Sequence, residues 1–545
     1  MSMNTKYIFV SGGVVSSLGK GITAAALGRL LKARGLKIAI QKFDPYINID
    51  PAGMSPFQHG EVYVTDDGAQ CDLDVGHYER FIDENLTGVC NITSGEIYWS
   101  VILKERRGEY MGETVQVIPH ITDEIKENVF RVAKTSGPDV VITEIGGTVG
   151  DMESQPFLEA VRQLKWELGP ENCVHIHVTL VPYIASAGEI KTKPTQHSVR
   201  ELRSIGIQPD IIVCRTEYAL SQDVKKKLAL FCNVEEDCVI ENQDVPTLYE
   251  VPLMLEAQGL GRIVCKKLCL TCPPPALDEW KAMVKRSTQP KHKIKLALVG
   301  RFTELRDAYL SVAEATHHAG VSNETEVELV WLSSCQFTDE ATACTLLEGV
   351  QGLLLPGSYD DLGVEGKLLA VQCARKNNLP FFGINSGMEI AVIEFARNVL
   401  HLSGANRSDL APDTPFPVVQ ELPFEPPKSP LPQIPMRLGS QDIQLTGDSL
   451  ASKAYGKTII HERHRHRSAL NGQYLTALHE KGLQVSGMSQ GIVEIVELQG
   501  HPFFLGVQFN PEFRSRPNRS HPLFNAFLQA ALCYAQDGSQ LRLKL

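Results

Sequence analysis

Residues 9–31 read FVSGGVVSSLGKGITAAALGRLL, and this stretch decides the fold of the first part of the chain. An apolar run ends at a glycine-rich turn, and an alanine- and leucine-rich stretch typical of a helix follows. Backbone N–H groups and the helix dipole at such a turn bind anions. The stretch therefore predicts a strand, a phosphate-binding turn and a helix, with Lys20 at the β- and γ-phosphates of a nucleotide.

The turn matches the phosphate-loop pattern GxxxxGK[ST] incompletely. Gly13 lies one residue too far from Gly19, and Gly21 follows the lysine where serine or threonine is usual. The alternative is an ordinary glycine-rich strand–helix turn, which many α/β proteins contain. The strand before the turn and the helix after it favour phosphate binding.

Further apolar, β-branched runs alternate with helical stretches up to about residue 270. Near-continuous apolar runs are typical of strands buried on both faces, so we predict a doubly wound, mainly parallel α/β sheet that is phosphate-loop-like. The predicted strands lie in KYIFVSGG, KIAIQKFDPY, DVVITEIGG, CVHIHVTLVPY and PDIIVCRT.

A second α/β domain is predicted after a proline-rich break. Residues 272–280 read CPPPALDEW, and three consecutive prolines continue neither a helix nor a central strand. The expected division is a first domain at 1–272, a linker at 273–292 and a second domain at 293–545. Residues 411–436 are rich in proline and predict a long surface loop. New strands are predicted in KIKLALVGRF, VELVWLSS, VQGLLLPG and LPFFGIN, followed by antiparallel strands in GLQVSGM, IVEIVEL and FFLGVQF.

Bulk composition limits the classes of function. A length of 545 residues exceeds one hydrophobic core, and the net charge of −11 argues against non-specific nucleic-acid binding. The 13 cysteines show no zinc spacing and are expected to be reduced thiols. We see no apolar run that would span a membrane and no leader, so we expect a cytoplasmic protein with no membrane partner.

Acidic residues near strand ends predict a magnesium site. Glu144 follows a buried apolar run, and open α/β sheets bind ligands at the carboxyl ends of their strands. Asp72 and Asp74 lie in CDLDVGHYERF. Carboxylates are the ligands that Mg²⁺ prefers, so metal binding is favoured over a structural salt bridge for Glu144. For Asp72, a solvated loop position is an equal alternative.

A basic cluster predicts a second phosphate site. Lys191 and Lys193 flank a threonine, and Gln196 follows them closely. These side chains suit a triphosphate and its sugar, although a KTK sequence alone usually marks a solvated loop. Lys227 either joins this cluster or faces water.

Residues 380–398 read PFFGINSGMEIAVIEFARN and have the layout of a nucleophile elbow, a sharp strand–helix turn that exposes one side chain. The apex position, between Gly383 and Gly387, is Asn385. An amide does not attack a carbonyl at neutral pH, so the elbow is kept without its nucleophile.

The first domain resembles the amidoligase (synthetase) domain of the CTP synthase family over its whole length. The resemblance rests on long stretches: SGGVVSSLGKGI, DPYINIDPAGMSPFQHGEVYV, DLDVGHYERF, ERRGEYMGETVQVIPHIT, EIGGTVGD and KTKPTQHSV. The second domain is similar to the family's class I glutamine amidotransferase domain through GINSGMEIAVIEFARN, ERHRHR and FNPEFRSRP.

The resemblance implies a mechanism in which ATP phosphorylates the 4-oxygen of UTP and an amine displaces the phosphate. It implies Lys20 and Lys42 as catalytic residues, and Asp74 and Glu144 as ligands of Mg²⁺. The implied ATP-binding set is Ser16, Ser17, Leu18, Gly19, Lys20, Gly21, Ile22 and Asp74. The implied UTP- or CTP-binding set is Ser16, Glu153, Lys191, Lys193, Gln196 and Lys227.

The second domain departs from the family pattern at its chemistry. Asn385 stands at the nucleophile position and Asn510 at the base position, while Glu512 is kept. The oxyanion loop reads PGSYDDLG, in which Ser358, Tyr359 and Asp360 replace small residues. Glu389 replaces an amide that contacts glutamine and is expected to put a negative charge there. Rescue by Ser386 is not expected, because it lies one place off the apex and lacks a base.

These substitutions predict a divergent member with a degenerate glutaminase site. We expect a ligase that uses free ammonia or another small amine, and Glu389 with Asp360 as a pocket for a cationic amine. The alternative is a non-catalytic paralogue that co-assembles with an active CTP synthase and regulates it. A third hypothesis is glutamine hydrolysis by an unrecognised nucleophile.

The resemblance also bears on assembly and effectors. It implies a homotetramer, because the family builds its UTP site from more than one subunit. GTP acts on glutamine hydrolysis in the family, so the resemblance gives no ground to expect a GTP effector here.

Overall fold

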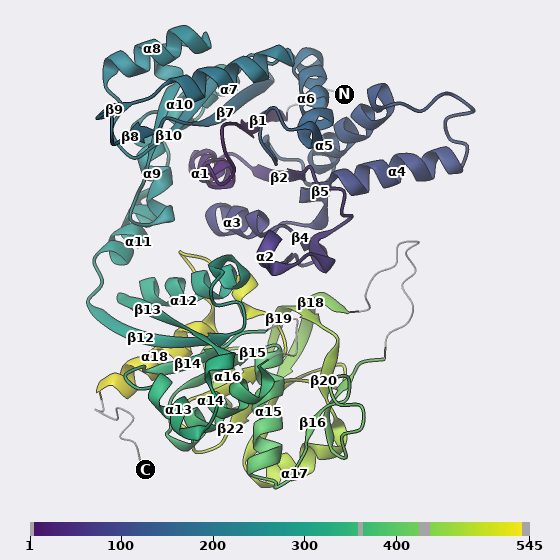
Figure 1. Ribbon diagram of the computed structural model, residues 1–545, viewed down its shortest axis with the longest axis vertical. Coiled ribbons are helices and arrows are strands. Elements are labelled where there is room, and N and C mark those ends of the chain that lie inside the picture. Colours follow the sequence, from purple (N-terminus) through teal and green to yellow (C-terminus); the bar gives the residue numbers. More distant parts are fainter. Residues whose placement is uncertain (1–4, 358–362, 424–435, 537–545) are drawn as a thin grey trace. The chain divides into compact units, whose positions relative to one another are not determined.

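The computed structural model describes residues 5–357, 363–423 and 436–536 (Figure 1). The chain divides into two compact units. The first contains the residues up to Gly53 together with Gln70–Val284. The second contains Met54–Ala69 together with the chain from Lys285 onward. Each unit has its own sheet and its own core.

The first unit is built on a seven-stranded sheet in the order β11-β10-β7-β1-β6-β2-β5, and its registered pairs are all parallel. The strand order runs outward in both directions from β1, which confirms the predicted doubly wound sheet. The strands are β1 (Lys6–Gly12), β2 (Ile38–Asp44), β5 (Asn91–Thr93), β6 (Val140–Ile145), β7 (Cys173–Leu180), β10 (Ile211–Thr216) and β11 (Val239–Gln243).

Helices alternate with these strands, as parallel connections require. Helix α1 packs on α3 and α9, while α5 packs on α6. The helices are α1 (Lys20–Lys32), α3 (Leu73–Ile82), α4 (Ser94–Arg106), α5 (Thr122–Ser136), α6 (Gln155–Leu168), α7 (Lys193–Ser204), α8 (Gln222–Cys232), α9 (Val251–Ala257) and α10 (Leu260–Lys267). Short strands are β4 (Gln70–Cys71), β8 (Tyr183–Ile184) and β9 (Glu189–Ile190).

The second unit is built on a nine-stranded sheet in the order β13-β12-β14-β15-β23-β22-β21-β18-β19. The pairs from β13 to β23 are parallel, and those from β23 to β19 are antiparallel. The predicted antiparallel strands β21 and β22 are confirmed, whereas β23 is also parallel to β15. The strands are β12 (His292–Gly300), β13 (Thr325–Ser333), β14 (Gly352–Leu355), β15 (Phe381–Ile384), β18 (Arg437–Leu445), β19 (Ile459–His466), β21 (Leu483–Ser489), β22 (Ile492–Leu498) and β23 (Phe504–Val507).

The core of the second unit lies on both faces of this sheet. Leu355 and Phe381 belong to one buried cluster, and Leu354 and Phe382 belong to the other. Successive strand residues point to opposite faces, so an uninterrupted apolar run fills both layers. The helices are α2 (Pro56–His59), α12 (Leu310–Ser322), α13 (Glu340–Leu346), α14 (Val364–Lys376), α15 (Ser386–Asn398), α16 (Leu450–Tyr455), α17 (Leu475–Glu480) and α18 (Pro522–Gln536).

The segment Met54–Ala69 precedes the proline-rich break by 200 residues in sequence, yet it packs in the second unit. It carries α2 and the short strand β3 (Tyr63–Val64). The Tyr63 hydroxyl donates a hydrogen bond of 2.8 Å to the carbonyl oxygen of Phe513, and Arg463 Nε lies 2.6 Å from Asp66 Oδ1. Arg463 is fully buried, so these contacts fix the segment firmly.

The two proline-rich stretches differ from simple loops. Residues 271–277 have no regular structure, but helix α11 (Asp278–Thr288) follows within the predicted linker, and Trp280 Nε1 donates to the carbonyl oxygen of Tyr249 at 2.7 Å. The prediction of a loop throughout 411–436 is wrong at β17 (Pro417–Glu421), which pairs with β16 (Asn406–Arg407) and β20 (Ser468–Leu470). Residues 424–435 lie outside the described residues.

Among the described residues, no helix is both long and apolar enough to cross a bilayer.

Replacing Gly387 with alanine should destabilise the second unit by about 3 kcal/mol. A Cβ at this position would lie 2.1 Å from the carbonyl oxygen of Leu355, which is backbone and cannot swing away. The matched control is Gly447→Ala, because a Cβ there meets nothing within 4 Å. Calorimetric unfolding of both variants checks this, and equal melting temperatures would contradict it.

Candidate functional sites

The turn after β1 holds its backbone in an unusual conformation. Val14 and Ser17 have φ angles of 87° and 58°, which non-glycine residues rarely adopt, and Gly19 has a φ of 83°. Gly12 has no room for a side chain, because a Cβ there would lie 2.5 Å from Cδ of Lys20. Backbone strain of this kind persists only where the surroundings enforce it, and it is frequent at ligand sites.

The predicted ATP-binding residues 16–22 form this turn and the start of α1. Ser16 and Ser17 are exposed, and Leu18 is buried and anchors the turn. Lys20 is the first residue of α1, and its ammonium donates to the carbonyl oxygen of Gly147, which follows β6. The turn therefore presents exposed polar groups above a helix N-terminus, as phosphate binding requires.

Four charged side chains converge at the carboxyl ends of β2 and β6. The ammonium of Lys42 donates to Asp74 Oδ2 and lies 3.3 Å from Glu144 Oε1 and 3.8 Å from Asp44 Oδ1. Lys42, Asp44 and Glu144 are buried. The sheet register makes Lys42 and Glu144 direct neighbours on adjacent strands. The predicted catalytic lysine and both predicted metal ligands therefore meet in one place.

Two residues of this cluster were not predicted from the sequence. Asp44 ends β2, and Tyr78 of α3 donates its hydroxyl proton to Glu144. Asp44 was detectable by the reasoning applied to Glu144, because it is also an acid at the end of a buried strand. Asp72 is the N-cap of α3, and its side chain accepts a bond of 2.9 Å from the Asp74 amide. This cap orients Asp74.

Burial sets the protonation of the cluster. Burial raises the pKa of Glu144, and burial together with the neighbouring Asp72 raises the pKa of Asp44 well above its usual value. Burial favours neutral Lys42, but the surrounding carboxylates outweigh it and raise its pKa well above the usual value. Burial also lowers the pKa of Lys20. The cluster thus contains one charged ammonium, that of Lys42, and more carboxyl groups than this single positive charge can neutralise.

These residues fit a divalent cation. A Cβ at Gly21 would lie 2.5 Å from Asp74 Oδ1 and 3.2 Å from Glu144 Oε2, so two carboxylate oxygens face the same small space beside the start of α1. Carboxylate oxygens are the ligands that Mg²⁺ prefers, and the cluster lacks positive charge. Asp74 and Glu144 would hold such an ion.

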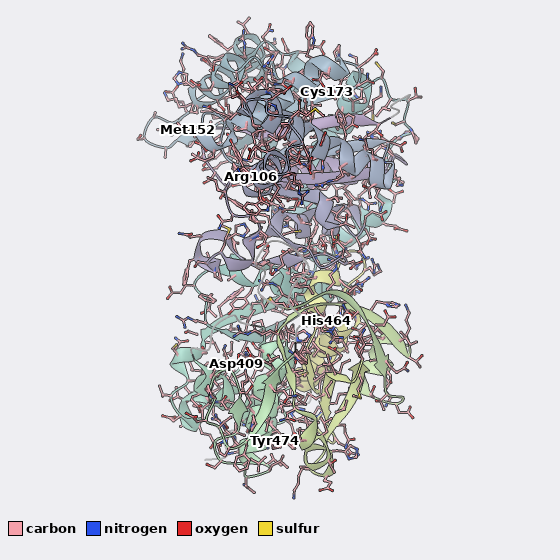
Figure 2. The ribbon with its side chains drawn as sticks, turned by 90° about the vertical axis from the view of Figure 1, so that its right-hand side faces the viewer. Arg106, Met152, Cys173, Asp409, His464 and Tyr474 are labelled. Atoms are coloured by element: carbon pink, nitrogen blue, oxygen red, sulfur yellow. The ribbon has the colours of Figure 1, made fainter. Side chains whose placement is uncertain are left out.

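The predicted basic cluster is brought together on α7, α8 and the β9 hairpin. Lys191 pairs with Glu189, and the charges of Lys191 and Lys227 both lower the pKa of Glu189. The Lys193 ammonium lies over the ring of Phe231, 5.9 Å from its centroid. Gln196 Nε2 donates to Thr192 Oγ1 at 3.1 Å. Glu153 is exposed in the short helix that follows β6, next to Met152, which Figure 2 shows at the surface.

The elbow has the geometry that the sequence predicts. Asn385 joins β15 to α15 with φ of 55° and ψ of −118°, far from helix or strand. The backbones approach closely there, because a Cβ at Gly383 would lie 2.7 Å from the carbonyl oxygen of Gly387. Ser386 is buried as the first residue of α15. The two glycines are thus required by packing, whatever side chain stands at the apex.

A hydrogen-bonded chain runs through Asn385, Asn510 and Glu512. Asn385 Nδ2 donates to the Arg465 carbonyl oxygen at 2.8 Å and to Asn510 Oδ1 at 3.3 Å. Asn510 Nδ2 in turn donates to Glu512 Oε1 at 2.8 Å. Burial raises the pKa of Glu512 to about 8. Asn385, Asn510 and Glu512 are thus bonded in sequence, at the nucleophile, base and acid positions of the family pattern. Neither amide is itself a nucleophile or a base.

Glu389 corrects an expectation. Its carboxylate is buried, lies 2.9 Å from Arg407 Nη1, and accepts bonds from Ser468 Oγ at 2.7 Å and Gln508 Nε2 at 2.9 Å. The prediction of a free negative charge that binds a cationic amine is wrong, because Arg407 neutralises it inside the protein. Ser358, Tyr359 and Asp360 lie outside the described residues.

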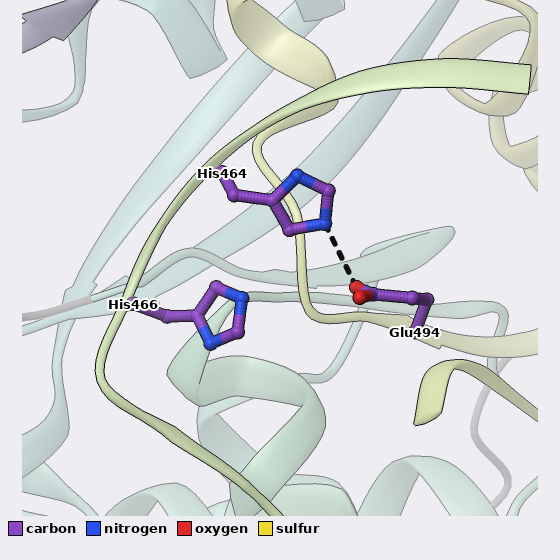
Figure 3. A group of neighbouring side chains, drawn as sticks. All are labelled: His464, His466 and Glu494. Atoms are coloured by element: carbon purple, nitrogen blue, oxygen red, sulfur yellow. Dashed lines mark hydrogen bonds and ion pairs between the residues drawn. The ribbon is translucent and has the colours of Figure 1, made fainter. Parts of the chain in front are cut away.

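A buried polar cluster joins β19 to β22 and β18 (Figure 3). His464 Nε2 lies 2.9 Å from Glu494 Oε2, and Arg437 donates to the other oxygen of Glu494. Nδ1 of His466 lies 2.8 Å from the Ser468 carbonyl oxygen, and burial lowers the pKa of His466 to about 3. Both oxygens of Glu494 thus have partners within the cluster.

Comparisons with known proteins match both units. The family model described as CTP synthase N-terminus matches residues 6–270, and the model described as glutamine amidotransferase class-I matches residues 304–530. A CTP synthase of Clostridium perfringens is 59% identical over 534 residues, which cover 98% of this chain and 99% of that protein. A CTP synthase of Ruminiclostridium cellulolyticum is 57% identical over the same shares of both chains. The solved glutaminase domain of a Trypanosoma brucei CTPS with bound acivicin is 33% identical and covers 44% of this chain and 94% of that chain, with a TM-score of 0.42.

Lys42→Met should destabilise the first unit by about 3 kcal/mol, because it leaves buried carboxylates without their cation. If Asp74 and Glu144 hold Mg²⁺, millimolar Mg²⁺ should raise the melting temperature of this variant more than that of the unaltered protein. Calorimetry with Mg²⁺ and with EDTA measures both effects. The exposed Lys226→Met serves as the control. Equal Mg²⁺ effects on all three proteins would argue against an ion at this cluster.

Glu512→Gln should flatten the pH dependence of stability between about pH 5 and pH 8. The pKa of Glu512 is raised in the folded state, so its protonated form stabilises at low pH and this contribution is lost as pH rises toward 8. The slope due to this group is at most about 1.4 kcal/mol per pH unit. Denaturant unfolding at several pH values measures it, and parallel curves for both proteins would refute the assignment.

Proposed function

Because the chain belongs to the CTP synthase family, we propose that it aminates UTP at C4 with free ammonia or another small amine instead of glutamine. ATP would phosphorylate the 4-oxygen of UTP, and the amine would displace the phosphate to give CTP or an N4-substituted analogue. Two observations together carry the proposal: the charged cluster of the first unit has all of its predicted residues, and the second unit has two amides, Asn385 and Asn510, at the nucleophile and base positions.

The first unit has the groups that phosphoryl transfer needs. Such transfer depends mainly on positioning and on stabilising negative charge. Lys20 begins α1 beside the strained turn, so its ammonium can reach the transferring phosphoryl group. Lys42 is held charged by carboxylates on its own and the adjacent strand. Mg²⁺ on Asp74 and Glu144 would neutralise phosphate charge when bound.

The nucleotide assignment follows the two basic regions. The turn of residues 16–22 suits the phosphates of ATP, with Asp74 beside it. Lys191, Lys193, Gln196 and Lys227 gather on α7 and α8, which supports a role in holding the UTP triphosphate. Both regions present exposed cations or N–H groups, whereas the overall charge of the chain is negative.

Loss of glutamine hydrolysis is supported by chemistry rather than by a collapsed fold. The elbow, the base position and Glu512 keep their mutual geometry, but a carboxamide neither attacks the substrate carbonyl nor accepts a proton at neutral pH. Removing a single triad member typically costs orders of magnitude in rate, and here both reacting members are replaced. Glutamine-dependent turnover should therefore be negligible, and a GTP effect on it should be absent.

The first unit also exposes large apolar side chains, which supports a homotetramer. Trp99 and Ile102 lie on α4, and Met111 and Ile118 follow it, with between 37% and 95% of each residue exposed. Apolar groups in such number on one segment usually mark an interface. We place the reaction in the cytoplasm, where the 13 cysteines would stay reduced.

Steady-state ADP release with ATP, Mg²⁺ and UTP tests the proposal. Ammonium or a small amine should support turnover, and glutamine should support less by roughly four orders of magnitude. Mass spectrometry of the product identifies the amine. Lys20→Ala is the control that removes the ligase reaction.

The outcomes separate the hypotheses. Turnover with glutamine would overturn the reading of Asn385 and Asn510. No turnover with any amine, together with tight binding to a separate active synthase, would favour a regulatory partner. Asn385→Cys combined with Asn510→His tests how much of the lost chemistry these two positions hold, and any labelling of the new thiol by a glutamine-analogue electrophile would show that the substrate pocket survives.

A further inference from the structure

A chain of buried polar side chains links three elements of the first unit. Ser11 Oγ on β1 lies 2.8 Å from His175 Nε2 and 2.9 Å from His177 Nδ1, both on β7. His177 Nε2 lies 2.8 Å from Ser198 Oγ on α7. All four residues are buried. The chain thus runs from the strand that feeds the phosphate turn to the helix that carries Lys193 and Gln196.

The phosphate-binding turn lies directly against these hydrogen-bonded side chains. The Gly13 amide donates to the Val178 carbonyl oxygen at 3.1 Å, which ties the start of the turn to β7. A Cβ at Gly13 would lie 1.7 Å from Ser198 Oγ and 3.3 Å from His177 Nε2. The turn and the helix therefore approach closely where Gly13 meets Ser198 and His177.

A second buried bond holds the same helix on the same strand. Thr179 Oγ1 donates to Thr195 Oγ1 at 2.8 Å, and Thr195 Oγ1 donates to the Leu180 carbonyl oxygen at 3.0 Å. The two buried polar residues of α7, Thr195 and Ser198, are therefore both bonded to β7, beside the buried apolar Val199 and Leu202. Burying polar groups is costly unless each finds a partner, and an apolar face would hold a helix on a sheet more cheaply. Directional bonds fix a helix in one position, which apolar contacts do less well.

The protons of the chain fit two orders. If His175 Nε2–H donates to Ser11, then Ser11 donates to His177 Nδ1, and His177 Nε2–H donates to Ser198. The reverse order puts the His175 proton on Nδ1, which is buried and has no hydrogen-bond partner among the described residues, so the first order is favoured. In this order each bond polarises the next. Burial lowers the pKa of His177 to about 3, so the imidazole stays neutral and the order does not change near neutral pH.

We propose that Ser11, His177 and Ser198 are positioning residues that lock the phosphate-binding turn to α7, so that ordering one nucleotide site orders the other. This inference rests on the proposed binding of ATP at the turn and of UTP at α7. The first ligand to bind orders the turn and α7 together, because the two are rigidly joined. The second ligand then pays a smaller entropic cost, which appears as positive coupling between the two ligands.

The test is a binding cycle on the full chain. The dissociation constant of UTP is measured by calorimetry with Mg²⁺, with and without a saturating non-hydrolysable ATP analogue. In the unaltered protein the analogue should tighten UTP binding by at least about five-fold. In Ser198→Ala and His177→Asn the effect should fall below about two-fold, while UTP affinity without the analogue changes little. Asparagine keeps a polar group near the Nδ1 position and loses the bond to Ser198.

The controls separate positioning from folding. Ser204→Ala removes a hydroxyl near the end of the same helix that only caps a carbonyl locally, and it should keep the full coupling. If His177→Asn unfolds the first unit, the test rests on Ser198→Ala alone. This variant removes only the hydroxyl oxygen and is therefore the milder change. Coupling that persists in folded Ser198→Ala, or that is absent in the unaltered protein, overturns the inference. Failure of the unaltered protein to bind UTP at all instead overturns the proposed function.

Discussion

One ammonium group, Nζ of Lys42, organises the charged centre of the first unit. It lies among Asp44, Asp74 and Glu144, which come from two strands and a helix. The parallel register pairs Lys42 with Glu144, and a slip of one residue would turn every side chain of β2 to the other face. The register is set by apolar runs that are buried on both faces. The packing of the sheet therefore also fixes where the charged side chains lie. A buried carboxylate without its cation is costly, which is why this cluster stays assembled.

In the elbow of the second unit, by contrast, the shape of the backbone does not depend on the polar side chains at the site. Its shape depends on Gly383 and Gly387, whose missing side chains allow β15, α15 and the end of β14 to approach closely. None of this depends on the chemistry of residue 385. Asn385 and Asn510 fill the apex and base positions, and each amide finds hydrogen-bond partners there. Packing therefore holds the backbone of the elbow, whatever side chain stands at its apex.

Local sequence patterns predicted most of the architecture. Apolar runs identified β1, β2, β6, β7 and β10, and the glycine spacing identified the elbow, because both signals come from residues that are neighbours in the chain. Asp44 was missed, although the same reasoning that found Glu144 applied to it.

Features that depend on distant partners were not predictable. Glu389 was expected to be a free charge, but Arg407, from a strand beyond the end of α15, neutralises it. Strand β17 was hidden in a proline-rich stretch, since its pairing with β20 links residues about 50 apart. The chain of Ser11, His177 and Ser198 joins three elements, and nothing in any one of them marks it. The packing of Met54–Ala69 in the second unit has the same cause, because its partners Arg463 and Phe513 are some 400 residues away.

The hydrogen bonds around Asn385 and Asn510 show how two amides fit at the apex and base positions of the second unit. Leaving a buried polar group without a partner costs about 1–3 kcal/mol, a large part of the stability of a domain. An apolar residue at position 510 would have left Glu512 without the donor that it now has. Asparagine at both positions supplies donors to the Arg465 carbonyl oxygen, to Asn510 Oδ1 and to Glu512 Oε1, and the raised pKa of Glu512 favours its neutral carboxyl near pH 7. Asn385 and Asn510 thus occupy the apex and base positions as a hydrogen-bonded pair, and Glu512 receives a donor at Oε1.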